Sequence, residues 1–403
     1  MKTLIVLGLT HNQVPMIQKA QELGFRVVAI GATREVPPAA HVADRWEPID
    51  TSDIAAVEEL VLQEQAVGIV TCGTSTAICT AAAINDRHSF SHAVLPYQVA
   101  FRAVRKDSMR QCLGDLLPPG AVARTTDEML RHAKQLGTHV AVKPVDGGGG
   151  RGISIVPAAD DAALVEAHSL ALATSRSDTV VVEEYLRGDV VGVESLVIDG
   201  QVFELAIADK TILPGYPTIT LGVVFPTHLC EAIRKRVIAR NREAIDRLGI
   251  LWGPTHIDMV VAKRGMPRIL DIGPRLAGGT LMSHLVPEAL GYDVYRATIE
   301  LAIGQIPPQP SPIPKGWHGS RFLIPGEPGQ LLKILYSPDA VAQHSIKNIK
   351  QLKADGDSID DIRDASARVL TYTTSADSYA QAKKNLEGFA KRVLIEMEEN
   401  LVA

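Results

Sequence analysis

The sequence has few cysteines, and they are scattered. Cys72, Cys79, Cys112 and Cys230 lie far apart, and no two of them form a C-x-x-C pair. A disulfide framework or a zinc site requires clustered or regularly spaced cysteines, so we expect neither. Reduced thiols of this kind are typical of a cytoplasmic protein, which is the predicted location.

The chain also lacks long apolar runs and an excess of basic residues. No apolar stretch approaches the roughly 20 residues of a membrane helix, and the run at residues 4–7 is too short for the core of a signal peptide. Lys and Arg number 41 against 46 Asp and Glu, for a net charge of -5, and no basic cluster is present. We therefore expect neither a membrane nor a nucleic acid as partner.

The first hundred residues alternate between strand-like and helix-like patterns. A β-α-β-α-β order of this kind predicts a parallel sheet with right-handed crossovers. The turn after the first strand lacks the G-x-G-x-x-G spacing of a dinucleotide site, so we do not expect nicotinamide binding. The expected strands are residues 4–7, 25–30 and 67–71, and the expected helices are residues 14–23 and 54–65.

The rest of the chain mixes helices with antiparallel strands. Asp199-Gly200 is a hairpin turn within residues 179–206, because this dipeptide suits the tight turns between antiparallel strands. A helix is predicted over residues 227–248, and the proline-rich stretch 307–312 has the composition of a linker.

A lysine followed by a glycine run is the strongest local signal. A predicted strand ends at Lys143, and Gly147 to Gly150 and Gly152 follow closely. Glycine lets backbone N–H groups approach an anion, and lysine suits phosphate oxygens. The order differs from the P-loop pattern. A glycine run alone is more often a plain loop, but the preceding lysine favours phosphate binding.

A second signal is an apolar strand that ends in Glu183-Glu184-Tyr185-Leu186. Extended backbone here can offer a C=O and an N–H to an adenine edge, with apolar neighbours on both faces of the ring. Taken alone, two acids after a strand are usually an exposed turn.

A third signal is a predicted hairpin that carries Asp258 on one strand and Asp271 on the other, with Arg275 just beyond. Two carboxylates facing each other repel unless a cation lies between them. Mg²⁺ held by carboxylates and nucleotide phosphates meets that need, although the pair could instead be a general acid and base.

These three signals follow one another in the order found in the ATP-grasp superfamily, and the chain resembles that family over roughly residues 1–335. The segment 105–110 is similar to the family's first phosphate-lysine segment. Within the family, the resemblance is best to the carboxylate–amine ligases that include L-amino-acid ligases, and the segment 320–329 is similar to part of their last lobe. The N-terminal domain is also similar to that of purine-pathway carboxylating relatives.

The resemblance implies an α/β protein with the ATP-grasp fold. A Rossmann-like domain would cover residues 1–104. The ATP-grasp domain would cover residues 105–306, with a lid at about 120–190. A small C-terminal lobe would cover residues 307–403.

The resemblance also implies the site. ATP would bind with Mg²⁺, or with Mn²⁺ in its place, held by Asp258 and Asp271, and Arg275 would steady the transferred phosphoryl group. His256 could deprotonate an amine, although a structural histidine is an equal alternative. The residues implied to contact ATP at its phosphates, its adenine hinge and its apolar walls are Lys106, Lys143, Gly148, Gly149, Gly150, Gly152, Ile153, Glu183, Glu184, Leu186, Val260 and Leu270.

The sequence departs from the family pattern at three places. Many relatives have Glu at both metal positions, and many have Asn where Gly273 stands. The ribose-binding Glu expected near the hinge falls at Val190, where Asp189 or Glu194 could replace it.

The function implied is an ADP-forming carboxylate–amine ligase that makes an amide or peptide bond through an acyl phosphate. Its substrates would be a small-molecule acid and amine, such as amino acids, and a homodimer is expected by analogy. Alternatives are a bicarbonate-using carboxylase, a thiol ligase and a non-catalytic ATP-binding module. Candidates for specificity include His11, Asn12, Thr74, Trp317 and Arg321.

Overall fold

The computed structural model describes residues 1–33, 37–262, 265–362 and 365–398. Its N-terminal part is a parallel sheet with strand order β3-β2-β1-β4, which confirms the predicted sheet. Strand β3 was not predicted, because its three residues carry two charges and no apolar pattern. The elements are β1 (Thr3–Leu7), α1 (Val14–Glu22), β2 (Arg26–Ile30), β3 (Arg45–Glu47), α2 (Ile54–Gln63), β4 (Ala66–Thr71), α3 (Ile78–His88) and α4 (Tyr97–Val104).

A second, antiparallel sheet with strand order β5-β8-β6-β7 lies in the region predicted as the lid. Helices α6 and α7 pack on it through apolar residues that include Met129, Leu164 and Ala171. The elements here are α5 (Lys106–Leu113), β5 (Gly120–Ala123), α6 (Thr126–Ala133), β6 (His139–Pro144), β7 (Ser154–Pro157), α7 (Asp161–Thr174) and β8 (Val180–Glu184).

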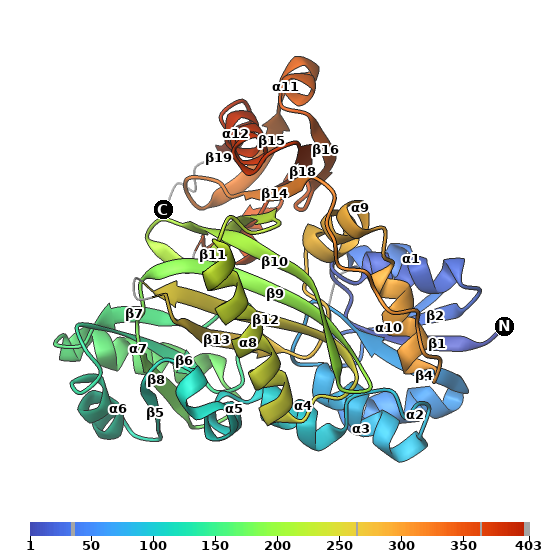
Figure 1. The fold of residues 1–403 in the computed structure, drawn as a ribbon, viewed down its shortest axis with the longest axis horizontal. Helices are drawn as coiled ribbons and strands as arrows, with labels where there is room; N and C mark the ends of the chain where they lie inside the picture. Colours follow the sequence, from blue (N-terminus) through green and yellow to red (C-terminus); the bar gives the residue numbers. More distant parts are fainter. Residues whose placement is uncertain (34–36, 263–264, 363–364, 399–403) are drawn as a thin grey trace.

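The centre of the molecule is an eight-stranded antiparallel sheet with strand order β13-β12-β9-β10-β11-β14-β18-β16. Helix α8 (Glu231–Leu248) lies across one face (Figure 1) and buries Val237, Ala244 and Ile245 there. It begins four residues later than predicted, and β11 before it was missed. The other central strands are β9 (Gly188–Ile198), β10 (Gln201–Leu213), β11 (Tyr216–Phe225), β12 (Gly253–Ala262) and β13 (Pro267–Gly273).

The C-terminal lobe continues this central sheet. Strand β14 pairs with β11, and β18 and β16 extend the sheet beyond it. A small sheet with strand order β17-β15-β19 and helix α12 complete the lobe, which lies at the top of Figure 1. The remaining elements are α9 (Val286–Leu290), α10 (Val294–Ala302), β14 (Trp317–Leu323), β15 (Gly329–Leu335), α11 (Pro338–Gln343), β16 (Ile346–Gln351), β17 (Ser358–Ile359), β18 (Leu370–Ala376), α12 (Tyr379–Ala390) and β19 (Leu394–Glu398).

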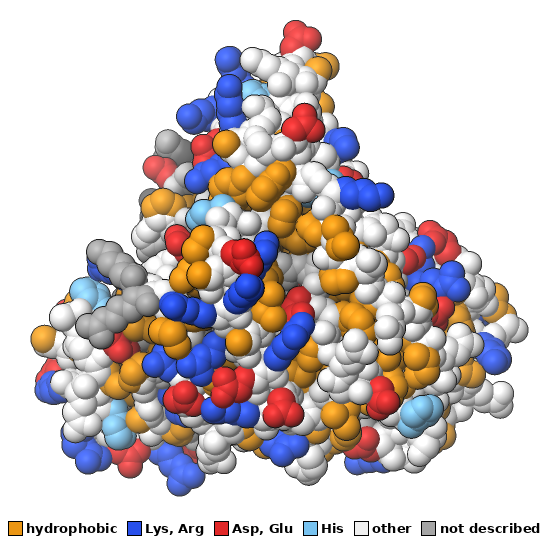
Figure 2. Space-filling model, in the orientation of Figure 1, with side chains coloured by type: hydrophobic (Ala, Val, Ile, Leu, Met, Phe, Trp, Pro, Cys, Tyr) orange, Lys and Arg blue, Asp and Glu red, His pale blue; other side chains and the backbone are white. Residues whose placement is uncertain are grey.

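Acidic and basic side chains are mixed over α8 on the face drawn in Figure 2. Lys235 pairs with Glu231 at 2.7 Å, and Arg247 pairs with Glu243 at 2.6 Å. Within the described residues, no helix combines the length and the apolar character needed to cross a membrane.

Candidate active site

The two predicted phosphate lysines are buried and lie close to the predicted carboxylates. Lys106 Nζ is 2.8 Å from Asp271 Oδ1 and 3.5 Å from the Gly147 carbonyl oxygen. Its backbone N–H donates to the Val145 carbonyl, which fixes the start of α5 against the glycine loop. The structure thus brings the first lysine, the glycine loop and the carboxylate hairpin together.

Lys143 connects the lid sheet to the same hairpin. Its Nζ is 2.8 Å from Glu183 Oε2 and 3.5 Å from the Leu270 carbonyl oxygen. Arg110 Nη2 reaches the other oxygen of Glu183 at 3.0 Å. The predicted adenine-hinge residue Glu183 therefore has a buried carboxylate that lies between two cations. This arrangement was not predicted from the sequence, because Arg110 comes from a separate helix.

The glycine loop adopts the backbone that only glycine takes readily. Gly149, Gly150 and Gly152 have φ of 67°, 82° and 70°. A Cβ at Gly152 would lie 2.6 Å from Thr174 Oγ1, whereas a Cβ at Gly148 would meet nothing within 4 Å. The loop thus needs glycine at some positions for its shape and leaves open space at Gly148.

The other residues that are predicted to surround adenine lie on the elements around Lys143. Glu184 ends β8, and its N–H donates to the Pro119 carbonyl, while Leu186 follows the strand. Ile153 precedes Ser154, which pairs in register with Val142. Val260 is buried on β12, next to the hairpin strand that carries Leu270.

Asp258 and Asp271 are partners across the β12–β13 ladder, as the sequence analysis expects. Each already contacts a lysine, because Lys210 forms an ion pair with Asp258 as Lys106 does with Asp271. Lys210 was not identified from the sequence, since the Asp209-Lys210 pair within β10 belongs to no motif.

His256 lies between two carboxylates. Its Nδ1 is 2.5 Å from Glu194 Oε1, and its Nε2 is 3.2 Å from Asp258 Oδ1. Burial alone would lower the pKa of His256, but these two carboxylates more than offset it and raise the pKa to about 9, with Lys210 opposing them. An imidazole that stays protonated at neutral pH cannot accept a proton, which disfavours the base role suggested for His256.

Glu194 and Asp258 are fixed by the same contacts. Burial would raise the pKa of Asp258, but Lys210 and His256 reverse this and hold it well below its ordinary value. Glu194 is completely buried, so of the two candidates for the ribose contact only Asp189 is exposed.

Arg275 occupies the space beside Gly273. A Cβ at Gly273 would lie 2.9 Å from the Arg275 guanidinium carbon, so glycine is what leaves room for this side chain. Arg275 Nη1 donates to the Leu276 carbonyl at 3.3 Å, and its Nε is buried without a hydrogen-bond partner among the described residues. The guanidinium therefore retains a donor for an anion.

Loops of the N-terminal sheet reach the segment just after Arg275. The Gly279 N–H donates to Asn12 Oδ1 at 2.8 Å, and the Gly73 N–H donates to the Leu276 carbonyl at 3.0 Å. Thr74 follows Gly73 in the same loop. The predicted specificity residues Asn12 and Thr74 thus lie next to the segment that follows Arg275.

The predicted specificity residues of the C-terminal lobe lie on β14 and are partly buried. The Trp317 ring packs edge-on against Tyr379 of α12, with centroids 5.7 Å apart. Arg321 is the ladder partner of the buried Tyr372. Neither contact reaches the N-terminal loops.

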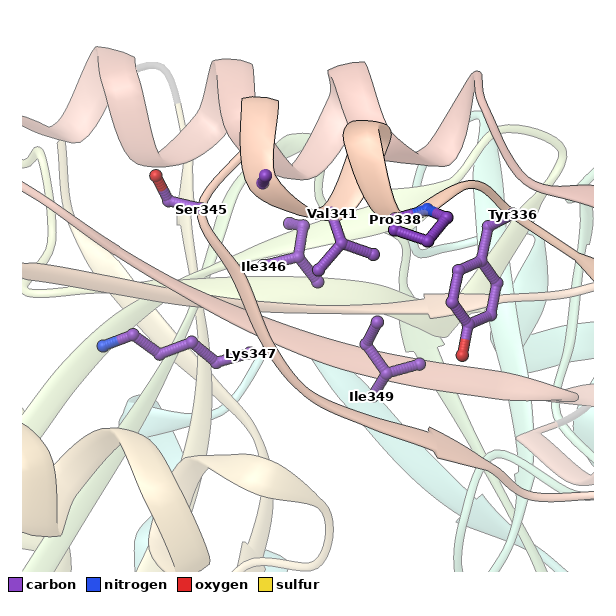
Figure 3. Close-up of a pocket in the computed structure, with 8 residues that line it drawn as sticks. Tyr336, Pro338, Val341, Ser345, Ile346, Lys347 and Ile349 are labelled. Atoms are coloured by element: carbon purple, nitrogen blue, oxygen red, sulfur yellow. The ribbon is translucent and has the colours of Figure 1, made fainter.

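A surface groove lies away from these residues. It has a volume of about 550 Å³ and lies between α11 and β16 in the C-terminal lobe, where Val341, Ile346 and Ile349 point into it (Figure 3). It contains none of the predicted site residues.

The donor set at the hairpin suits Mg²⁺. Carboxylate oxygens are the ligands that Mg²⁺ takes from proteins, usually one or two of them, with phosphates and water completing the octahedron. Among the described residues, no group of three or more His, Cys, Asp and Glu forms a complete metal cage. An ion here would therefore need the nucleotide phosphates as ligands.

Comparison with known proteins identifies the same region. Residues 117–279 match the ATP-grasp domain family. The chain is 29% identical over 195 residues to the formate-dependent phosphoribosylglycinamide formyltransferase of Prochlorococcus marinus, covering 47% of this chain and 48% of that protein. It is 25% identical over 133 residues to the alanine–anticapsin ligase of Bacillus subtilis, covering 30% of this chain and 28% of the ligase. The matches span less than half the length of these curated relatives.

The whole fold also has solved counterparts. The L-amino acid ligase from Bacillus licheniformis superposes with a TM-score of 0.82 at 20% identity, covering 99% of both chains. The matched family region contains the glycine loop, Glu183, the Asp258–Asp271 pair and Arg275. Residues 117–279 therefore form an ATP-grasp domain, and the whole chain shares the fold of the L-amino acid ligase.

Proposed function

We propose that this protein is an ATP-dependent, ADP-forming ligase that joins a small carboxylic acid to an amine. The observation that carries the proposal is the convergence of two buried lysines, a glycine loop, a carboxylate pair and a partly unpaired arginine on one hairpin. The similarity to an alanine–anticapsin ligase and to the fold of an L-amino acid ligase supports amino acids as the substrate class.

The lysines and the glycine loop would bind the ATP phosphates. In the structure, Lys106 pairs with Asp271 and Lys143 pairs with Glu183. Both lysines can turn to the phosphate oxygens of ATP, which carry more charge. Their positive charge offsets the charge that develops on the transferred phosphoryl group, which is the main catalytic need in phosphoryl transfer. Glu183 would keep Arg110 as its partner when Lys143 turns away.

Mg²⁺ would be held together with the phosphates at the hairpin that carries Asp258 and Asp271, where it would neutralise phosphoryl oxygens. The product of the first step is an acyl phosphate, formed when a carboxylate oxygen attacks the γ-phosphorus and ADP leaves. Water would destroy this species, so the lid that carries the glycine loop has to close over it.

Arg275 would bind the acyl phosphate through the donors that it has free. Its guanidinium lies between the carboxylate pair and the Gly279 segment, which contacts Asn12 of the N-terminal sheet. The amine would attack the acyl carbon at this junction, and phosphate would leave. We assign the acid and amine pockets to the N-terminal loops around Asn12 and Thr74 for this reason.

Phosphate release from MgATP, measured over all pairs of the amino acids, tests the proposal. Release that requires both members of a pair, with a condensed product of the expected mass, supports the ligase. Release that depends on bicarbonate and needs no amino acid would favour a carboxylase instead. ATP binding without phosphate release from any acid and amine would favour the non-catalytic reading. The cytoplasmic location and the homodimer stay predictions.

A further inference from the structure

Asp258 is bound by cations of the protein itself. Its Oδ1 contacts Lys210 Nζ and lies 3.2 Å from His256 Nε2. The Lys210 side chain is 11% exposed and that of Asp258 is 24% exposed, so water screens this pair little. The carboxylate thus already has a lysine as its counter-ion before any metal arrives.

A glycine makes this contact possible. Gly192 of β9 lies in register between Asp258 on one side and Ala208 on the other. A Cβ at position 192 would lie 3.1 Å from Lys210 Cε and 3.5 Å from Asp258 Oδ1. Because this side chain is missing, Lys210 can reach across β9 from β10 to Asp258.

Lys210 supplies the positive charge that faces Asp258. A divalent ion on Asp258 would meet this ammonium group close by, and Coulomb repulsion at this partly buried position would oppose it.

Asp271 differs from Asp258 in each of these respects. Its side chain is 40% exposed, and its one ion-pair partner in the described structure is Lys106. Lys106 also lies 3.5 Å from the glycine-loop carbonyl of Gly147, so it faces the proposed phosphate site. When Lys106 turns to ATP, Asp271 is left in need of a cation. Two residues further along β13, Gly273 offers no ligand and Arg275 fills the space.

We propose that this site binds a single divalent ion with the nucleotide, on Asp271, and that Lys210 serves as the permanent counter-cation of Asp258 in place of a second ion. This inference rests on the proposed function, because it assumes that a metal–nucleotide complex binds at the hairpin. It gives Asp258 and Asp271 different roles, whereas the family resemblance implies that both hold the metal.

Counting bound Mn²⁺ tests it. The full-length protein, in excess over a non-hydrolysable ATP analogue with an imido bridge, is titrated with Mn²⁺, and free Mn²⁺ is followed by electron paramagnetic resonance. The wild type is expected to hold one ion per bound nucleotide. Two ions would overturn the inference and leave the proposed function intact. No nucleotide-dependent ion would overturn the proposed function itself.

Two isosteric variants provide the matched comparison. Asp271→Asn is expected to weaken Mn²⁺ binding by at least tenfold, whereas Asp258→Asn should keep one ion with its affinity changed less than threefold. Equal losses in both variants would show that both aspartates are ligands and would overturn the inference.

Lys210→Met gives the converse test. Removal of the counter-cation should let a second Mn²⁺ bind beside Asp258, while Lys210→Arg should still hold one. If the Lys210→Met variant holds only one ion, the role given to Lys210 is contradicted. Because the aspartate pair is tested separately, the inference can be refuted even if Lys210→Met does not fold.

Discussion

Replacing Glu183 by glutamine separates a structural role of this residue from an adenine-binding role. The carboxylate is 5% exposed and lies between Lys143 at 2.8 Å and Arg110 at 3.0 Å. Glutamine has nearly the same shape but no charge, so both cations would remain buried without a counter-ion. The change should therefore destabilise the lid and not simply weaken ATP binding.

The structure indicates the size of this effect. Removal of one partner of a buried ion pair costs about 3–5 kcal/mol. Arg110 also donates to the Pro118 carbonyl at 3.0 Å, and Lys143 lies 3.5 Å from the Leu270 carbonyl. These acceptors reduce the loss, so we expect about 3 kcal/mol. At about 2–4 °C per kcal/mol for a unit of 150–250 residues, such as the predicted ATP-grasp domain at 105–306, the unfolding transition of this domain should fall by roughly 6–12 °C.

Thermal unfolding of the wild type, Glu183→Gln and Glu184→Gln, each with and without MgATP, measures this. Glu184 is half-buried and forms no ion pair in the described part of the chain, so its variant should stay within about 0.5 kcal/mol of the wild type. ATP should stabilise Glu183→Gln more than the wild type, because its phosphates supply Lys143 with the missing anion. A Glu183→Gln protein of normal stability that binds ATP poorly would refute this reasoning.

Three further predictions concern the loop, the buried histidine and the metal side of the site. Gly152→Ala should lower the free energy of unfolding by about 1–2 kcal/mol, because position 152 has a positive φ, and the clash with Thr174 should add to this loss. Gly148→Ala should leave the free energy of unfolding nearly unchanged. Denaturant melts of the two variants measure the difference. The pKa of His256 is raised to about 9 from 6.5, so its stabilisation is complete below about pH 6.5 and is lost as the pH rises through 9. The unfolding free energy of the metal-free protein should fall by at most about 3 kcal/mol over that range, and His256→Gln should remove this slope; an unchanged slope in the variant would show that another group is responsible. Asp271→Asn should lower acid- and amine-dependent phosphate release at least 100-fold at saturating ATP, and full turnover with saturable Mg²⁺ would show that Asp271 is not a metal ligand.

Strong periodic patterns made much of the fold predictable. Strands β1, β2 and β4 were identified within one residue of their observed starts, because apolar residues of a buried parallel strand run without interruption. Asp199 and Gly200 both have positive φ, as the predicted tight turn requires. Strand β11 was missed although it pairs with β10 just before it, because Pro214 and Pro217 in this segment are typical of turns and not of central strands.

The site was predictable where a residue belongs to a local motif. Lys143, the glycine loop and the register of Asp258 with Asp271 could be read from short segments. Lys210 and Arg110 could not, because their partners come from distant strands and helices. The lack of a side chain at Gly192 matters only once three strands are placed side by side.

The central claim is that ATP activates a carboxylate as an acyl phosphate. We would label the carboxylate oxygens of the acid found in the pair screen with ¹⁸O and analyse the products by mass spectrometry. The account predicts that one ¹⁸O passes from the acid to inorganic phosphate in each turnover and that ADP carries none. Appearance of the label in AMP, or its absence from phosphate while the condensed product forms, would contradict it.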